Sequence, residues 1–243
     1  MPSQKIQLVN GEMYHIVLRS VGDTTIFRDE NDYYRGIFSI YEFNNEKSAE
    51  IWKRRRDRII EKKKEKFGGS PTSPELLATD KRDKLVEIFA FSLMPNHIHL
   101  FVKQLKDSGI TKFMQKVGGG IANYFNKKYN RKGHLFNQFK AVRVKDDEQL
   151  HNVFVYIHAN RISLVEPGWK EKGIKNPKKV IEFLKKDKWH SFPDYIGGKA
   201  FPSVTNRDFI SRAMGGQSGC EQAIVNWVKH KRGLKNFDEI ILE

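Results

Sequence analysis

The most informative stretch of this sequence reads Leu93-Met94-Pro95-Asn96-His97-Ile98-His99-Leu100-Phe101-Val102. Side chains alternate between the two faces of a β-strand, so His97 and His99 share one face and the apolar residues beside them share the other. The apolar side chains would anchor the strand in a core, while two adjacent imidazoles could bind one divalent cation. A His-x-His pattern alone more often marks two half-exposed strand histidines than a metal site.

The same stretch joins two strands. Proline cannot donate to a sheet ladder, so Pro95 belongs in a turn between strands at 86–93 and 97–103. Hydrophobic periodicity and capping residues predict the other elements: a strand at 13–18, helices at 29–43 and 111–129, a strand at 138–144, and helices at 146–163 and 177–186. This order predicts an α+β fold, an antiparallel sheet with packed helices.

Two segments differ from this pattern. Residues 44–84 contain a lysine- and arginine-dense helix followed by a Gly/Ser/Pro-rich break, and we interpret them as a basic excursion from a domain spanning 1–200. This excursion is either a solvated helix or an arm that contacts nucleic acid. Residues 201–243 are expected to form a small helical tail, with Ile224, Trp227 and Val228 as its apolar stripe.

Three consecutive glycines, Gly118 to Gly120, interrupt the helix predicted at 111–129. Each costs about 1 kcal/mol relative to alanine in a helix interior. They would either kink the helix or let another part of the chain approach it closely.

Charge is the strongest compositional signal. Among 243 residues, 44 Lys and Arg face 29 Asp and Glu, which gives a net charge of +15. Such an excess is typical of proteins with a polyanionic partner, and nucleic acid fits best. An anionic membrane fits less well because the sequence has no long amphipathic anchor and no apolar run near the roughly 18 residues that cross a bilayer. A merely soluble basic protein is the alternative.

The cysteine count bears on location. Cys220 is the only cysteine, so no intrachain disulfide and no cysteine-rich zinc site can form. The first residues contain no apolar signal core. We therefore expect a cytoplasmic protein.

A second group of residues follows later in the chain. Tyr156 and Asn160 are four residues apart on a predicted helix and share one face. A tyrosine in such a stripe is most often a core residue, but the amide of Asn160 could give an oxygen ligand to a cation held by His97 and His99. Such a cation would keep open positions for a phosphate.

Together these motifs resemble the single-tyrosine HUH transposases of bacterial insertion sequences, most closely the REP-associated tyrosine transposases. The resemblance covers roughly residues 11–200. It rests on Met94-Pro95-Asn96-His97-Ile98-His99, Tyr156-Ile157-His158-Ala159-Asn160, Tyr14-His15-Ile16, Tyr124-Phe125-Asn126, Gly133-His134-Leu135-Phe136 and Trp189-His190-Ser191-Phe192-Pro193-Asp194-Tyr195. The chain departs from the family at Arg161, where proline is common, at the triple glycine and in the long excursion.

The resemblance implies a ferredoxin-like HUH endonuclease fold and a metal-dependent single-strand DNA endonuclease and strand transferase. Tyr156 would be the nucleophile that forms a 5′-phosphotyrosine intermediate, and His97, His99 and Asn160 would bind Mg²⁺ or Mn²⁺. The substrate would be a DNA hairpin with an adjacent single-stranded sequence. A homodimer that pairs the histidines of one subunit with the tyrosine helix of the other, and a monomer with the whole site in one chain, both agree with the family.

Basic and aromatic residues interleave around these motifs and suggest a groove for single-stranded DNA, with ordinary solvated faces and core aromatics as the alternative. The candidates are Lys112, Lys116, Tyr124, Lys127, Lys128, Arg131, Lys132, Lys140 and Arg143. Tyr124 also competes as nucleophile but has no metal-binding partner one turn away. Four other histidines, His15, His134, His151 and His158, are most simply structural or DNA-contacting.

Two rival functions remain. A replication-initiation or plasmid-mobilising nickase would use the same chemistry, but such proteins are larger or carry a helicase, and this sequence has no ATPase loop. A domesticated module would bind hairpin DNA without cutting it.

Overall fold

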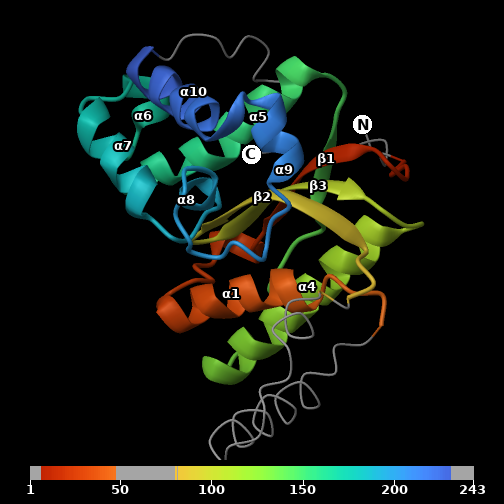
Figure 1. The fold of residues 1–243 in the computed structure, drawn as a ribbon. Helices are drawn as coiled ribbons and strands as arrows, with labels where there is room; N and C mark the ends of the chain where they lie inside the picture. Colours follow the sequence, from red (N-terminus) through yellow and green to blue (C-terminus); the bar gives the residue numbers. More distant parts are fainter. Residues whose placement is uncertain (1–6, 48–79, 81, 231–243) are drawn as a thin grey trace, which may run out of the picture.

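The computed structural model describes residues 7–47, 80 and 82–230. Its centre is a four-stranded antiparallel sheet (Figure 1). The strands are β1 (Met13–Arg19), β2 (Val86–Met94), β3 (His97–Gln104) and β4 (Lys140–Val144), in the order β2-β3-β1-β4. Helix α1 (Glu30–Glu42) connects β1 to β2, and α4 (Gly109–Lys128) connects β3 to β4. This βαββαβ arrangement is ferredoxin-like, and it confirms the predicted α+β fold.

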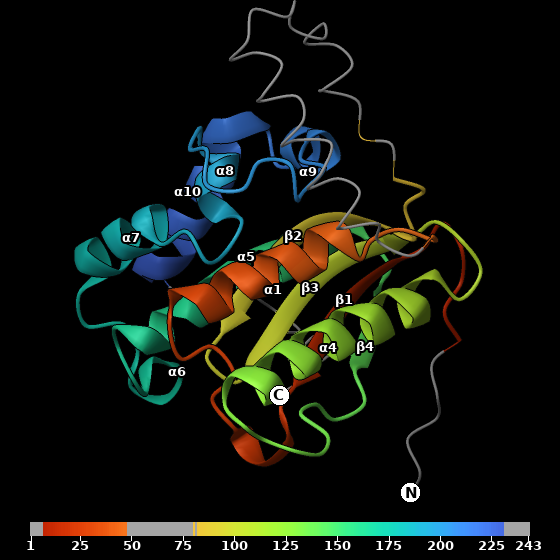
Figure 2. The ribbon, with the colours of Figure 1, turned by 90° about the horizontal axis from the view of Figure 1, so that it is seen from below.

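The two faces of the sheet are covered by different helices. Helices α1 and α4 pack on one face, where Ile98 and Leu100 are fully buried (Figure 2). Helix α5 (Asp147–Ala159), which continues as the short 3-10 helix η2 (Asn160–Leu164), covers the other face and packs with Phe101. The alternation predicted for β3 therefore places His97 and His99 between the sheet and α5.

The rest of the described chain forms small helices. They are η1 (Val21–Asp23), α6 (Trp169–Lys172), α7 (Pro177–Lys186), α8 (Phe192–Tyr195), α9 (Asp208–Ala213) and α10 (Gly216–His230). In the expected helical tail, residues 201–207 form turns and coil, and α9 and α10 supply the helix as far as residue 230. Its apolar stripe, Ile224, Trp227 and Val228, is buried in the same cluster as α5. In the described part of the chain, no helix is both long and apolar enough to cross a membrane.

Local sequence signals explain where the helices begin. Asp29 accepts a hydrogen bond from the backbone N–H of Asp32 at 3.1 Å, and the Asp32 carboxylate accepts one from the backbone of Asp29, which completes a capping box. Asp146 caps α5 in the same way by accepting from the N–H of Gln149 at 2.7 Å. The predicted element limits hold within two residues, except that the helix expected at 146–163 divides into α5 and η2.

The triple glycine lets α1 approach α4. Helix α4 runs through these glycines without interruption. A Cβ atom on Gly120 would lie 2.1 Å from Cε2 of Phe43, just beyond the end of α1, whereas a Cβ on Gly119 would meet no atom within 4 Å. Arg35 of α1 also donates to the carbonyl of Gly120 at 3.0 Å. Close approach, rather than a kink, accounts for Gly120.

The predicted excursion lies mostly outside the described residues, since 48–79 and 81 are not described. Its two ends lie side by side. The buried side chain of Asn44 donates to the carbonyl of Val86 at 2.8 Å and accepts from the backbone N–H groups of Leu85 and Val86. Glu46 donates its backbone N–H to the carbonyl of Asp83 at 2.8 Å. We refer to these contacts as the Asn44 clasp.

Candidate active site

Strand register determines which residues surround the two histidines. In the β1–β3 pair, Arg19 lies directly opposite His97, and Val17 lies directly opposite His99. Directly opposite residues share a face of the sheet, so both β1 side chains are on the side covered by α5. Arg19 is therefore a cation at the rim of the site, with its side chain one-third exposed and paired with Asp23 at 3.0 Å.

The two histidines are buried and adjacent. His97 is 6% exposed and His99 is fully buried, and their ring centroids are 4.7 Å apart. Nδ1 of His97 lies 2.6 Å from Oδ1 of Asn96. This hydrogen bond leaves Nε2 as the nitrogen of His97 through which a ligand would be bound.

His15 is a third histidine of this group. It lies opposite Phe101 in the register and thus diagonal to His99. Its Nε2 is 3.0 Å from Nδ1 of His99, and the two rings are stacked with centroids 5.3 Å apart. His15, like His99, is fully buried.

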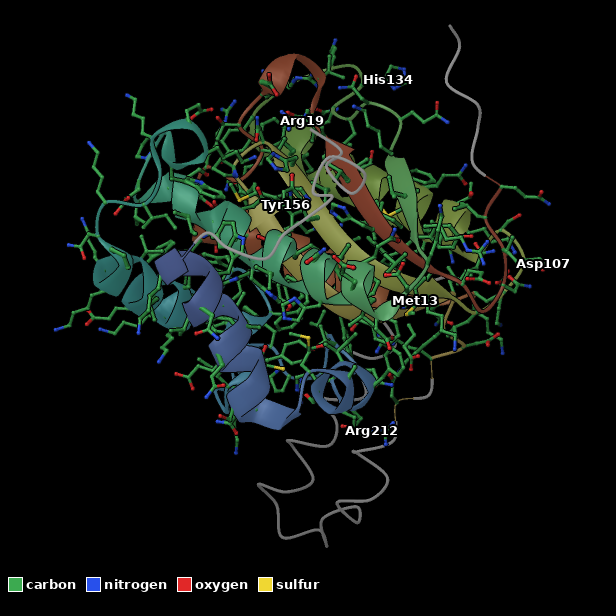
Figure 3. The ribbon with its side chains drawn as sticks, turned by 90° about the horizontal axis from the view of Figure 1, so that it is seen from above. Met13, Arg19, Asp107, His134, Tyr156 and Arg212 are labelled. Carbon is green, nitrogen blue, oxygen red and sulfur yellow. The ribbon has the colours of Figure 1, made fainter. Side chains whose placement is uncertain are left out.

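The end of α5 lies above these rings, and Figure 3 shows Tyr156 where this helix crosses the sheet. The Tyr156 ring meets the rings of His99 and His15 edge-on, at 5.7 and 5.6 Å between centroids. One turn later, Nδ2 of Asn160 lies 3.4 Å from Nε2 of His99. The fold thus brings together His97, His99, Tyr156 and Asn160, which are far apart in the sequence.

Arg161 holds the end of α5 against β2. It is 3% exposed, forms an ion pair with the buried carboxylate of Asp187, and donates to the carbonyl of Leu93. Leu93 stands just before the turn that leads to His97, so Arg161 ties the residue after Asn160 to the start of the histidine strand. Arg161 thereby helps to position the end of α5 relative to the histidine strand.

Burial determines the charge state of His99. Burial lowers the pKa of His99 well below its usual range, and the nearby His97, His15, Lys170 and Arg19 lower it further. The ring is therefore neutral at neutral pH, the form that presents a nitrogen lone pair. Lys170 of α6 also lies close to the tyrosine, with Nζ 5.8 Å from the Tyr156 ring centroid.

A cation site here would need an amide oxygen. Among the described residues, no three His, Cys, Asp or Glu side chains form a group able to hold a metal ion. A half-turn of the Asn160 amide would exchange its nitrogen for its oxygen. Two ligands of one cation at about 2.1 Å each lie roughly 3.0–3.4 Å apart, so the 3.4 Å contact with His99 is compatible with a shared ion.

The DNA-binding candidates are distributed over both sides of the sheet. Five of them lie on α4, across the sheet from the histidines: Lys112, Lys116, Tyr124, Lys127 and Lys128. Three of the α4 lysines have protein partners. Lys112 pairs with Glu46 at 2.7 Å, Lys128 pairs with Asp32 at 2.6 Å, and Lys116 donates to backbone carbonyls beside Asn45. The structure does not bring these residues to the tyrosine.

The candidates near β4 are closer to the histidine side. Lys140 lies opposite Val17, which itself lies opposite His99, so its exposed side chain is on the face covered by α5. Arg143 pairs with Glu12, while Arg131 donates to carbonyl groups of its own loop, and Lys132 is exposed. Lys140 is therefore the basic candidate that the register aligns with the site.

Sequence reasoning missed three neighbours of the site. The pairing of β1 with β3 places His15 and Arg19 in the site, and only this pairing could have indicated them. Lys170 reaches the site from α6. His158, expected to be structural or DNA-contacting, is fully buried and its Nε2 lies 2.9 Å from Oγ of Ser191. His134 and His151 are exposed.

Comparisons with known proteins give one family. The family model described as "Transposase IS200 like" matches residues 49–160. Among curated proteins no match was found.

Solved structures give only distant likenesses. A REP-associated tyrosine transposase bound to a REP hairpin is 14% identical, with a TM-score of 0.44, over 86% of this chain and 93% of that one. A bacterial tRNA(His) guanylyltransferase-like protein in complex with ATP is 12% identical, with a TM-score of 0.39, over 78% and 77%. Such low values carry no functional conclusion. The matched family segment, however, contains both β3 histidines as well as Tyr156 and Asn160, so the chain is similar to the IS200-like transposases over the part that carries the candidate site.

Proposed function

We propose that this protein is an IS200-like transposase that cuts and rejoins single-stranded DNA beside a hairpin, with Tyr156 as the nucleophile. One observation carries the proposal: Tyr156 lies edge-on to His99, whose Nε2 is also in contact with Asn160. A nucleophile and a phosphate-binding centre would then be close enough to act on the same phosphodiester. The family match of the same segment supports this chemistry.

The reaction would transfer a phosphoryl group twice. The phenol oxygen of Tyr156 attacks phosphorus in line, and the bond from phosphorus to the 3′ oxygen breaks as the new bond forms. The phenol gives up its proton to a base as it attacks, and the departing 3′ oxygen takes up a proton. The resulting 5′-phosphotyrosine keeps the bond energy, so a 3′-hydroxyl can later attack it and rejoin the DNA.

His97, His99 and Asn160 would hold Mg²⁺ or Mn²⁺ in this site. When bound, the ion would withdraw charge from the scissile phosphate and orient it. The neutral state of His99 suits this role. Lys170, beside the tyrosine ring, would stabilise negative charge on the phenol oxygen as its proton leaves.

The DNA would contact two sides of the protein. Lys140 and Arg19, on the histidine side, would contact the backbone of the scissile strand. The α4 candidates, across the sheet, would contact a more distant part of the DNA such as the hairpin. Lys127 is exposed there and makes no hydrogen bond or ion pair with other described residues, whereas the lysines already paired would have to exchange their partners for phosphates.

The nucleophile is tested by Tyr156→Phe. We expect no covalent adduct on a hairpin oligonucleotide with Mg²⁺ or Mn²⁺, and hairpin binding close to wild type, because only the reacting oxygen is lost. A 3′-end label should stay with the wild-type protein on a denaturing gel, and a 5′-end label should be released. Tyr124→Phe, on α4, is the matched control and should keep the adduct.

An adduct formed by the Tyr156→Phe chain would contradict the assignment. If the wild-type chain bound hairpins tightly yet gave no adduct with any of a pool of sequences, a non-catalytic hairpin-binding role would replace this proposal.

The two DNA-contacting sides are tested by Lys140→Ala and Lys127→Ala. We expect Lys140→Ala to weaken binding of an unstructured single strand and to reduce its salt slope by about 0.7, the value for one lost phosphate contact. Lys127→Ala removes the same charge on the other side, so it should spare the unstructured strand and weaken only hairpin binding. Salt titrations of both substrates give the comparison, and equal losses on both would rule out two separate sides.

A further inference from the structure

We infer that His15 is a positioning residue that keeps the proton of His99 on Nδ1, which leaves Nε2 of His99 able to bind a cation. The inference rests on the proposed function and assigns a role to a residue outside the proposed ligand set. His15 and His99 are both fully buried, and Nε2 of His15 lies 3.0 Å from Nδ1 of His99. One proton must therefore lie between these two nitrogens.

The position of that proton determines what His99 can bind. A neutral imidazole carries a single N–H. If His99 donates from Nδ1 to His15, then Nε2 keeps a lone pair. If His15 donates instead, His99 must carry its proton on Nε2, where it would block a cation. The two tautomers thus differ in whether His99 can act as a ligand at all.

The far side of the ring indicates the first tautomer. The Asn160 atom nearest to Nε2 of His99 is Nδ2, at 3.4 Å, and an amide nitrogen can only donate. With the amide in this orientation Nε2 is an acceptor, which places the proton on Nδ1. The contact between His15 and Nδ1 on the other edge of the ring fits this tautomer, with His99 as the donor. Cation binding would require the Asn160 amide to turn, while the bond to His15 would stay in place.

Ring contacts fix the position of His15. Its ring is stacked on His99 at an interplanar angle of 13°, and both rings meet the edge of Tyr156. Partners that orient a metal-binding histidine from its second nitrogen raise metal affinity by about 10–100-fold. His15 would supply this effect, and it would also help to set the position of the tyrosine ring.

The experiment compares His15→Leu with His15→Gln in the full chain. Gln keeps a carbonyl oxygen that can accept the Nδ1 proton, whereas Leu removes every acceptor. Long-range ¹H–¹⁵N NMR of the metal-free wild-type chain should show His99 protonated at Nδ1. Titration with Mn²⁺, followed by electron paramagnetic resonance, should show affinity about 10–100-fold lower for His15→Leu and within a few-fold of wild type for His15→Gln. Thermal unfolding confirms that each variant is folded.

Two results would overturn the inference: a wild-type His99 protonated at Nε2, or a folded His15→Leu chain with wild-type Mn²⁺ affinity. If His15→Leu does not fold, the inference is tested by the tautomer of His99 in the wild type and by the Mn²⁺ affinity of His15→Gln. His97→Ala separates this inference from the proposed function. If His97→Ala binds Mn²⁺ as the wild type does, the metal centre itself is wrong, and the NMR result still decides whether His15 holds the proton of His99.

Discussion

At the scale of single residues, the buried histidines serve two purposes. Those on β1 and β3 surround the tyrosine, whereas His158 of α5 contacts Ser191 in the loop after α7, and His190 of that loop contacts α7. Nε2 of His190 donates to the carbonyl of Leu184 at 3.0 Å, and burial together with the nearby Arg161 lowers the pKa of His190 to about 3. This second group is neutral and structural.

His190 should make the fold sensitive to acid. Below the ordinary histidine pKa of about 6.5, the unfolded chain binds a proton that the folded chain refuses, so stability falls as pH falls. For one such group the loss from pH 7 to pH 5 is about 2 kcal/mol, and His158, whose pKa burial also lowers, acts in the same direction. Urea unfolding at the two pH values should show a smaller difference for His190→Gln, which keeps an N–H for Leu184. An unchanged difference would contradict this role.

At the scale of elements, sequence pattern predicted the parts but not their neighbours. Alternation in β3 correctly separated His97 and His99 from Ile98, and the caps at Asp29 and Asp146 located two helices. Alternation determines the face on which a side chain lies, but not which strand pairs with which. His15 could not be assigned to the site for this reason, because its neighbour His99 is 84 residues away in the sequence.

The glycines of α4 give a matched pair of variants. Gly120→Ala should destabilise the protein by about 1–3 kcal/mol, since the new methyl group would overlap the Phe43 ring and force α1 and α4 apart. Gly119→Ala faces open space and should stabilise the helix by up to about 1 kcal/mol. Urea denaturation measures both changes. Equal stability of the two variants would mean that Phe43 does not restrict α4.

At the scale of the whole molecule, the sheet separates the proposed reacting groups on one face from helices α1 and α4 on the other. The proposed reacting groups all lie on the α5 side, and α5 is in turn packed against α7 and α10 in one core cluster. The C-terminal tail therefore packs against the helix that carries Tyr156. Within one chain, the tyrosine already meets His99.

A single-chain site predicts no complementation. A Tyr156→Phe chain mixed with a His97→Ala chain should form no adduct on a hairpin oligonucleotide, because each chain lacks one part of its own site. Adduct yield on a denaturing gel, measured against the wild type at the same total concentration, provides the test. Recovery of adduct in the mixture would instead reveal a homodimer with each site shared between two subunits.

The Asn44 clasp has a consequence for how this protein could vary. Its hydrogen bonds join Asn44 to Leu85 and Val86 at the start of β2. They hold the two ends of the excursion together at the edge of the sheet. Insertions or deletions beyond these contacts would leave the hydrogen bonds of the clasp in place, and with them the part of the sheet that carries the proposed site.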